Sequence, residues 1–133
     1  MSMFDINPAD ASPIWRQIEE GMRRMISLGT LHPGAAVPSV RDLAQQLRVN
    51  PNTVARAYQR LTDAGVFAVR RGEGTFVADA PAQLRKSERN ETLRDAATRY
   101  AGTALSVGAS LEEASAELEH GFSRLVREHR RKA

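Results

Sequence analysis

Four side chains between positions 52 and 60 carry the hydrogen-bonding groups that proteins use to read duplex DNA: Asn52, Thr53, Arg56 and Arg60. In a helix, the last three fall near one face, because residues three and four apart are neighbours. Asparagine can pair with adenine, while arginine can pair with guanine or hold a phosphate. The opposite face is apolar: Val54, Tyr58 and Leu61. We therefore expect one side of this helix to pack on a core and the other to enter a major groove. The alternative is a solvated polar face.

Three further positions could contact the same duplex. Arg41, one turn into a preceding short helix, could hold a phosphate or a base; the alternative is a surface arginine paired with Asp42 or Asp63. Arg71 and Gly72 are expected near the tip of a hairpin. Arginine suits the narrow, electronegative minor groove, and glycine lets the backbone approach closely. The alternative for Arg71 is an edge charge that discourages strand aggregation.

The charge distribution favours a polyanionic partner. Residues 41–72 contain six arginines against two aspartates, a net charge of +4, whereas the whole chain carries +3. One short segment therefore carries the basic excess. The chain contains no cysteine, which excludes disulfides and thiolate zinc sites and fits a reducing cytoplasm. No nucleophile–base set is visible, and His120 and His129 give a metal site little support, so we expect neither an enzyme nor a cofactor.

The residues between these positions predict helices joined by short turns. Residues 1–11 are expected to be a loose lead-in, and Ser12, followed by a proline, is expected to cap the first helix. Ser39 is expected to cap a second helix, and Asn50 a third that covers about residues 51–64. Because only three residues separate these last two helices, the pattern is typical of a helix-turn-helix.

A change from helical to alternating periodicity follows. Residues 66–70 and 75–78 are β-prone runs separated by a glycine-rich link, which predicts a hairpin whose tip lies within residues 70–75. Three helices followed by a hairpin make a winged helix-turn-helix domain, expected over residues 1–79. The predicted fold class is mainly α with a small β-hairpin.

Residues 80–133 are expected to form two helices that mediate dimerisation. Gly108 separates two helical segments, and Ser110 with Glu113 forms a capping box at the start of the second. No apolar run approaches the ~20 residues of a membrane span. Two helices cannot bury both their apolar stripes within one chain, so we expect a two-fold dimer that binds a pseudo-palindromic operator. The expected dimer core is Leu105, Leu111, Leu118, Phe122 and Leu125.

Residues 13–77 resemble the DNA-binding domain of the GntR family of bacterial transcription regulators. The resemblance rests on five motifs: G-x-L-x-P-G, P-S-x-R-x-L-A, V-N-x-N-T-V-x-x-A-Y, L-x-x-x-G and G-x-G-T-F-V. The short helical remainder is similar to the YtrA subfamily, whose C-terminal helices dimerise. The resemblance implies DNA contacts from Arg41, from residues 50–53, from Arg56, and from a wing-tip pair at Arg71 and Gly72. Pro51 stands where many members have arginine, so one base contact of the family is absent here.

The expected function is a cytoplasmic, homodimeric, sequence-specific transcription regulator that represses by occluding a promoter. A small-molecule effector, if there is one, would bind between protomers or at the joint between domains. The second hypothesis is a winged-helix module for protein interaction or assembly, without specific DNA binding. The concentration of arginine favours the first hypothesis, because an assembly module has no need of it.

Overall fold

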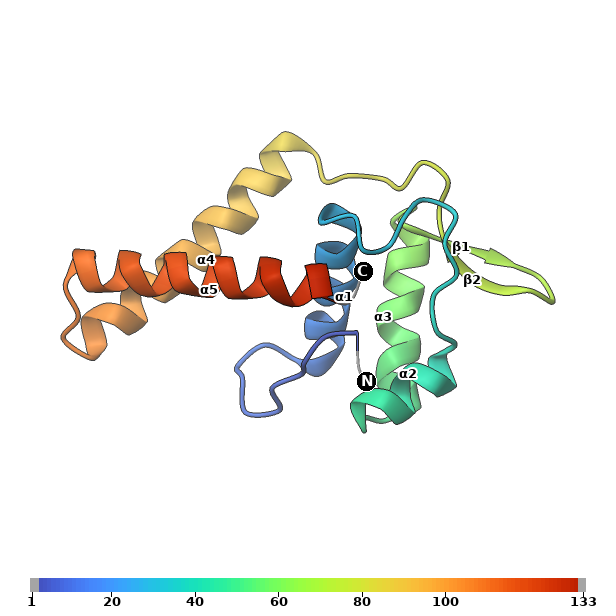
Figure 1. The fold of residues 1–133 in the computed structure, drawn as a ribbon, viewed down its shortest axis with the longest axis horizontal. Helices are drawn as coiled ribbons and strands as arrows, with labels where there is room; N and C mark the ends of the chain where they lie inside the picture. The colour runs from blue at the N-terminus through green and yellow to red at the C-terminus, as the bar shows by residue number, and fades with distance from the viewer. Residues whose placement is uncertain (1–2, 132–133) are drawn as a thin grey trace. The chain divides into compact units, whose positions relative to one another are not determined.

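The computed structural model describes residues 3–131, which form five helices and one hairpin (Figure 1). The elements are α1 (Ile14–Ser27), α2 (Val40–Leu47), α3 (Pro51–Asp63), β1 (Phe67–Arg70), β2 (Gly74–Val77), α4 (Lys86–Ser106) and α5 (Leu111–Arg131). The described residues divide into two compact units, one of residues up to Ala82 together with 129–131, the other Gln83–Glu128. Three helices followed by a hairpin, then two long helices, confirm the predicted fold class.

Local capping positions α2 and α3. The Ser39 hydroxyl accepts the Asp42 N–H at 3.0 Å, and the Asn50 carboxamide oxygen accepts the Asn52 N–H at 2.8 Å. Between the helices, Arg48 turns the chain in the left-handed region at φ 57°. Both predicted caps are confirmed, and they fix where each helix begins.

The predicted cap of α1 was wrong. The N-cap position is held by Pro13, not Ser12, and no side chain bonds to the first turn. The Ser12 hydroxyl is buried without a hydrogen-bond partner. The helix begins one residue late because proline, which fits the first helical position, here keeps the extended backbone of a cap, at ψ 150°.

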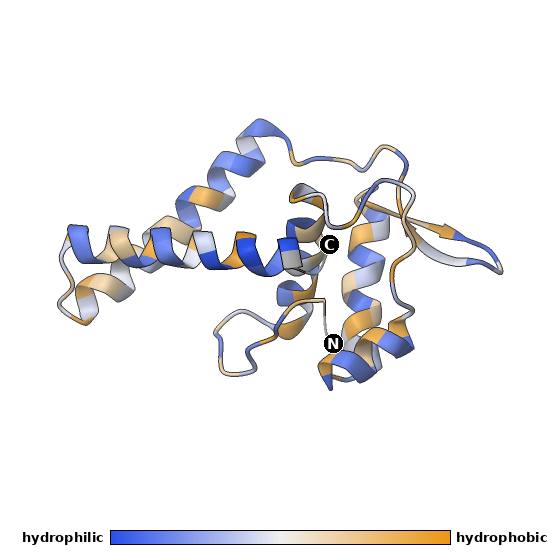
Figure 2. Ribbon diagram, in the orientation of Figure 1, coloured by the Kyte–Doolittle hydropathy of each residue, from blue (hydrophilic) through white to orange (hydrophobic). Residues whose placement is uncertain are grey.

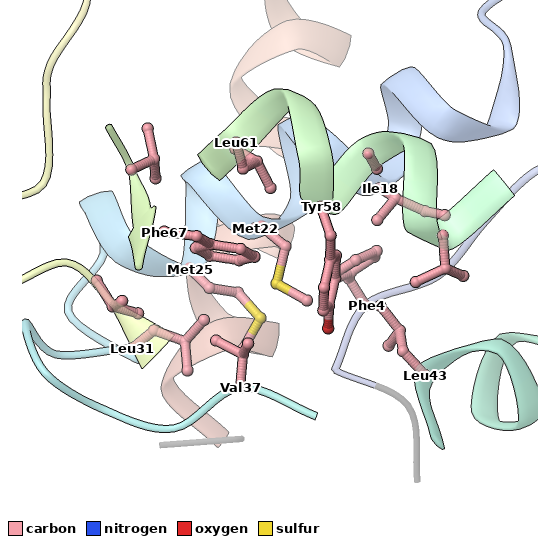
Figure 3. Packing of buried hydrophobic residues seen from close by; sticks show 14 of the residues in the cluster. Phe4, Ile18, Met22, Met25, Leu31, Val37, Leu43, Tyr58, Leu61 and Phe67 are labelled. Carbon is pink, nitrogen blue, oxygen red and sulfur yellow. The ribbon is translucent and has the colours of Figure 1, made fainter. Parts of the chain in front are cut away.

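The core of the first unit lies where α1, α2, α3 and the hairpin meet (Figure 3). The Tyr58 ring of α3 meets the Phe67 ring of β1 edge-on, with 5.2 Å between centroids, and its hydroxyl donates to the Pro38 carbonyl at 2.6 Å. Burial, with a smaller contribution from the negative charge of Asp42, raises the pKa of the Tyr58 phenol above its ordinary value. Tyr58 thus ties α3 to both β1 and the residues before α2.

The residues before α1 add to this core. A loose lead-in was predicted there, but Phe4 is buried against α1. Its ring atoms lie 2.7–2.8 Å from where a Cβ on Gly21 would stand, so only glycine fits beneath it. Periodicity could not predict this contact, because Phe4 lies outside any regular element.

The hairpin is anchored by a third backbone segment. Strands β1 and β2 pair antiparallel, with Phe67 opposite Val77 and Arg70 opposite Gly74. On the other edge of β2, Ala36 bridges to Phe76, and the Val37 N–H donates to the Thr75 carbonyl at 3.0 Å. No strand was predicted for this segment. Strand β2 is therefore bonded along both of its edges, while the hydrophilic tip of the hairpin projects beyond the ladder (Figure 2).

The second unit is a pair of helices with little core of its own. The predicted capping box is present: Glu113 N–H donates to the Ser110 hydroxyl and Ser110 N–H to the Glu113 carboxylate, both at 3.1 Å. The Tyr100 hydroxyl of α4 donates to the Ala114 carbonyl of α5 at 2.7 Å. Ala104 is the buried residue of α4. Within residues 3–131, no helix has both the length and the apolar character that crossing a membrane requires.

Candidate nucleic-acid interface

The first turns of α3 offer polar groups to solvent. Asn52 and Arg56 are exposed and Thr53 is half-buried, while the apolar face predicted for this helix is buried in the core. Asn50 is exposed too, but its carboxamide oxygen is occupied by the cap, which leaves its amino group to donate. The N-terminal end of α3 therefore has the donors and acceptors that reading a groove requires.

Two arginines of α3 lie against an aromatic ring of α1. The guanidinium carbons of Arg56 and Arg60 each lie 4.5 Å from the centre of the Trp15 ring. Arg60 also pairs with Glu19 of α1, with 2.9 Å from Nε to Oε2, and its side chain is half-exposed. Among the described residues, no carboxylate pairs with Arg56. Of the two, Arg56 therefore keeps the uncompensated charge.

Arg41 and Arg71 are both exposed. Neither forms an ion pair within the described part of the chain, so Arg41 does not pair with Asp42 or Asp63. Asp63 instead accepts from the Gln59 amide at 2.8 Å. Both arginines are free to contact an anion from outside the domain.

The hairpin turn separates two arginines by role. Arg70 lies over the Phe76 ring, 4.2 Å from its centre, and 3.8 Å from the Asp79 carboxylate. Arg71 follows it in the turn, where Gly72 and Gly74 have positive φ values of 79° and 122°. The tip thus projects one free cation, while its neighbour is held against the strand.

The two residues of α1 that contact Arg56 and Arg60 of α3 were not predicted to do so. Trp15 and Glu19 are four apart and so share a helix face, yet they lie outside the buried stripe of α1, which contains Ile18, Met22 and Met25. An aromatic residue beside that stripe was the one available signal. Within residues 3–131, no three potential metal-ligating side chains gather where an ion could bind.

The residues predicted to form a dimer core are all exposed on the second unit. Leu105 is 77% exposed, Leu111 83%, Leu118 59% and Phe122 71%, with Leu125 less open at 37%. An open cavity of about 360 Å³ lies between α4 and α5, lined by Ala97, Ala101, Ala104, Ala114 and neighbouring side chains. Exposed apolar side chains in this number are typical of an interaction surface.

Comparison with known proteins identifies similar sequences. Residues 15–77 match the profile of the bacterial regulatory proteins of the gntR family. The chain is 39% identical over 77 residues to the HTH-type transcriptional repressor YtrA of Bacillus subtilis, covering 58% of this chain and 59% of that protein. It is 35% identical over 108 residues to the HTH-type transcriptional regulator Rv1152 of Mycobacterium tuberculosis, covering 81% and 84%.

Solved structures show the same architecture. A transcriptional antiterminator of Listeria monocytogenes is 28% identical with a TM-score of 0.73, over 94% of this chain and 93% of that one. YtrA of Sulfolobus acidocaldarius, a GntR-family transcription factor, is 30% identical with a TM-score of 0.60, over 73% and 99%. The DNA-binding domain of AraR, solved in complex with operator ORX1, is 28% identical with a TM-score of 0.51, over 56% and 93%.

Proposed function

Because this chain belongs to the GntR family of DNA-binding transcription regulators, we propose that it represses transcription as a homodimer bound to a pseudo-palindromic operator. The observation that carries the proposal is the exposed start of α3, where Asn52, Thr53 and the uncompensated Arg56 stand together. The repressor name of the Bacillus YtrA relative supports the direction of regulation. In this proposal the protein acts in the cytoplasm, and it represses because the bound dimer blocks access to the promoter.

We assign α3 to the major groove. Its first turns carry the side chains that discriminate base edges, and Arg41 of α2 holds the adjacent backbone. Asn50 donates its remaining amide hydrogens, and the exposed half of Arg60, whose charge Glu19 compensates, faces the phosphates. Pro51 cannot supply the base contact that arginine makes in many family members, so the operator depends more on Arg56 and Thr53.

We assign the wing to the minor groove. Arg71 and Gly72 occupy the exposed turn between β1 and β2, beyond the last paired residues of the ladder. A narrow minor groove concentrates negative potential and attracts an inserted arginine. The backbone at Gly72 needs no side-chain clearance there, which suits a close approach.

The dimer would form through α4 and α5. Packing of α4 on α5 alone buries little apolar surface. Ala104 is the buried residue of α4, and several leucines of the two helices stay exposed. A second copy would cover Leu105, Leu111, Leu118, Phe122 and Leu125 and close the cavity between the helices. Two-fold symmetry then sets two half-sites about one helical turn apart.

The test is selection of duplexes from a random pool by the full-length protein. Repeated enrichment should yield an inverted repeat, bound 10³-fold or more above random DNA, within the range of about 10³–10⁷ for specific regulators. Affinity should fall steeply with salt, since phosphate contacts release counterions. Failure to enrich any sequence would favour the assembly-module hypothesis, in which the winged domain binds protein instead.

A further inference from the structure

The sole tryptophan of the chain lies beside the proposed reading surface. Trp15 occupies the first turn of α1, half-buried at the edge of the core. Besides Arg56 and Arg60, Arg16 approaches its ring at 5.7 Å from the centre. Three guanidinium groups therefore meet one aromatic side chain, an arrangement that core packing alone does not require.

Helix geometry explains why the two helices meet in this way. Arg56 and Arg60 are four apart on α3, and Trp15 and Glu19 are four apart on α1, so each pair lies on one face of its helix. The aromatic ring contacts both arginines, and the carboxylate pairs with Arg60 alone. Glu19 thus compensates one cation and leaves Arg56 held only through its ring contact.

A ring contact restrains an arginine without consuming its donors. Attraction between an aromatic face and a guanidinium acts on the cation as a whole, so the N–H groups in the guanidinium plane stay available. A free arginine loses the rotamer entropy of its long side chain when it is fixed. Restraint in the unbound protein lowers that loss on binding, which is the usual source of gains from preorganisation.

We propose that Trp15 is a positioning residue for DNA recognition, which holds the Arg56 guanidinium at the reading surface before the duplex arrives. This inference rests on the proposed function, because it assigns Arg56 to a base edge. Trp15 itself makes no base contact in this scheme. Its contribution should therefore appear as sequence preference transmitted through Arg56, and not as a uniform gain in affinity for DNA.

The experiment is a double-mutant cycle on the full-length protein. Trp15→Leu removes the ring and keeps an apolar side chain, Trp15→Phe keeps a smaller ring, and each is combined with Arg56→Ala. The probes are the selected inverted repeat and a random duplex of equal length at one salt concentration. We expect Trp15→Leu to lower the preference for the repeat roughly 3- to 10-fold, within the range of partly desolvated cation–π contacts. Trp15→Phe should retain most of it.

The Arg56→Ala background distinguishes positioning from packing. There, Trp15→Leu should leave the preference unchanged, because the residue through which it acts is gone. An equal loss in both backgrounds, or an equal weakening on both duplexes, would overturn the inference. Circular dichroism melting checks that each variant folds. If Trp15→Leu does not fold, Trp15→Met, which also lacks the ring and fills more of the space, takes its place in the cycle.

The same measurements separate the two proposals. If the wild-type protein prefers the repeat and Trp15→Leu prefers it equally, the positioning role fails and the proposed function stands. If the wild-type protein shows no preference for any duplex, both fail together.

Discussion

The Nε atom of Arg60 lies 2.9 Å from Oε2 of Glu19, so an ion pair joins the last turn of α3 to α1. Glu19 is largely buried, at 14% exposure, while Arg60 is half-exposed. The pair therefore fixes the orientation of the recognition helix on the core and cancels one positive charge close to the proposed DNA surface.

Glu19→Gln should lower the stability of the domain and make its affinity for DNA more dependent on salt. Losing a half-exposed pair should lower the free energy of unfolding by about 0.5–1 kcal/mol. Arg60 would then be an uncompensated cation, so the slope of log affinity against log salt should steepen by about one phosphate contact. Urea unfolding and binding titrations at several salt concentrations measure the two effects. An unchanged slope would mean that Arg60 does not face the duplex.

Arg71→Ala should remove one charge from the minor groove. The salt slope should fall by about 1, and any preference for A·T-rich DNA flanking the half-sites should weaken, because a narrow groove rewards an inserted arginine. Arg70→Ala is the matched control: its guanidinium already lies over Phe76 and near Asp79. Equal effects from both variants would contradict the role assigned to the wing tip.

Phe122→Glu should dissociate the proposed dimer. A carboxylate on an apolar surface that must be desolvated opposes association strongly. Sedimentation at micromolar concentration should find one chain where the wild type shows two, and operator affinity should fall about 10²-fold or more as the linked half-sites are lost. Ser123→Glu, the adjacent exposed position, should leave both unchanged. A monomeric wild type would refute the dimer directly.

Tyr58→Phe should reveal an alkaline component of stability. Loss of the hydrogen bond to the Pro38 carbonyl should cost about 1–2 kcal/mol at neutral pH. Burial raises the pKa of Tyr58, so above the unfolded value of about 10 the unfolded chain ionises while the folded phenol does not. Wild-type stability should thus be intact below pH 10 and decline above it. Denaturant titrations across that range should show a shallower decline in Tyr58→Phe.

Arg48→Gly should stabilise the domain. Arg48 holds φ 57° between α2 and α3, a left-handed conformation that costs a residue with a side chain about 1–2 kcal/mol and costs glycine almost nothing. We expect the free energy of unfolding to rise by roughly 0.5–1 kcal/mol, after the greater freedom of glycine in the unfolded chain is subtracted. Gln46→Gly, in the ordinary helical backbone of α2, should lower it by a similar amount. Thermal melts compare the two.

Most of what was predicted correctly depends on residues close together in the chain. Ser39, Asn50 and the Ser110–Glu113 box cap their helices because each bonds within three positions. The hairpin follows from alternation and glycines across a short link. A single sequence is enough to predict such features, because the interacting residues are neighbours in the chain whatever the rest of the fold is.

The missed features join distant segments. Trp15 and Arg56 are 41 positions apart, and residues 34–37 reach β2 across α2 and α3. Neither pairing can be predicted from hydrophobic periodicity. Trp15 lies beside the buried stripe of α1, and the contact of residues 34–37 with β2 is made by the backbone, which requires no particular side chain. The sequence therefore predicts which side chains of α3 could contact DNA, but it does not predict that Trp15 contacts Arg56.

The backbone bridge between Ala36 and Phe76 has one more consequence. Because β2 is bonded along both of its edges, residues inserted between Arg71 and Glu73 would leave every rung below the turn in place. The length of the wing can thus change without loss of stability in the rest of the domain. A longer wing would contact a wider stretch of duplex from the same fold, and a shorter wing a narrower one.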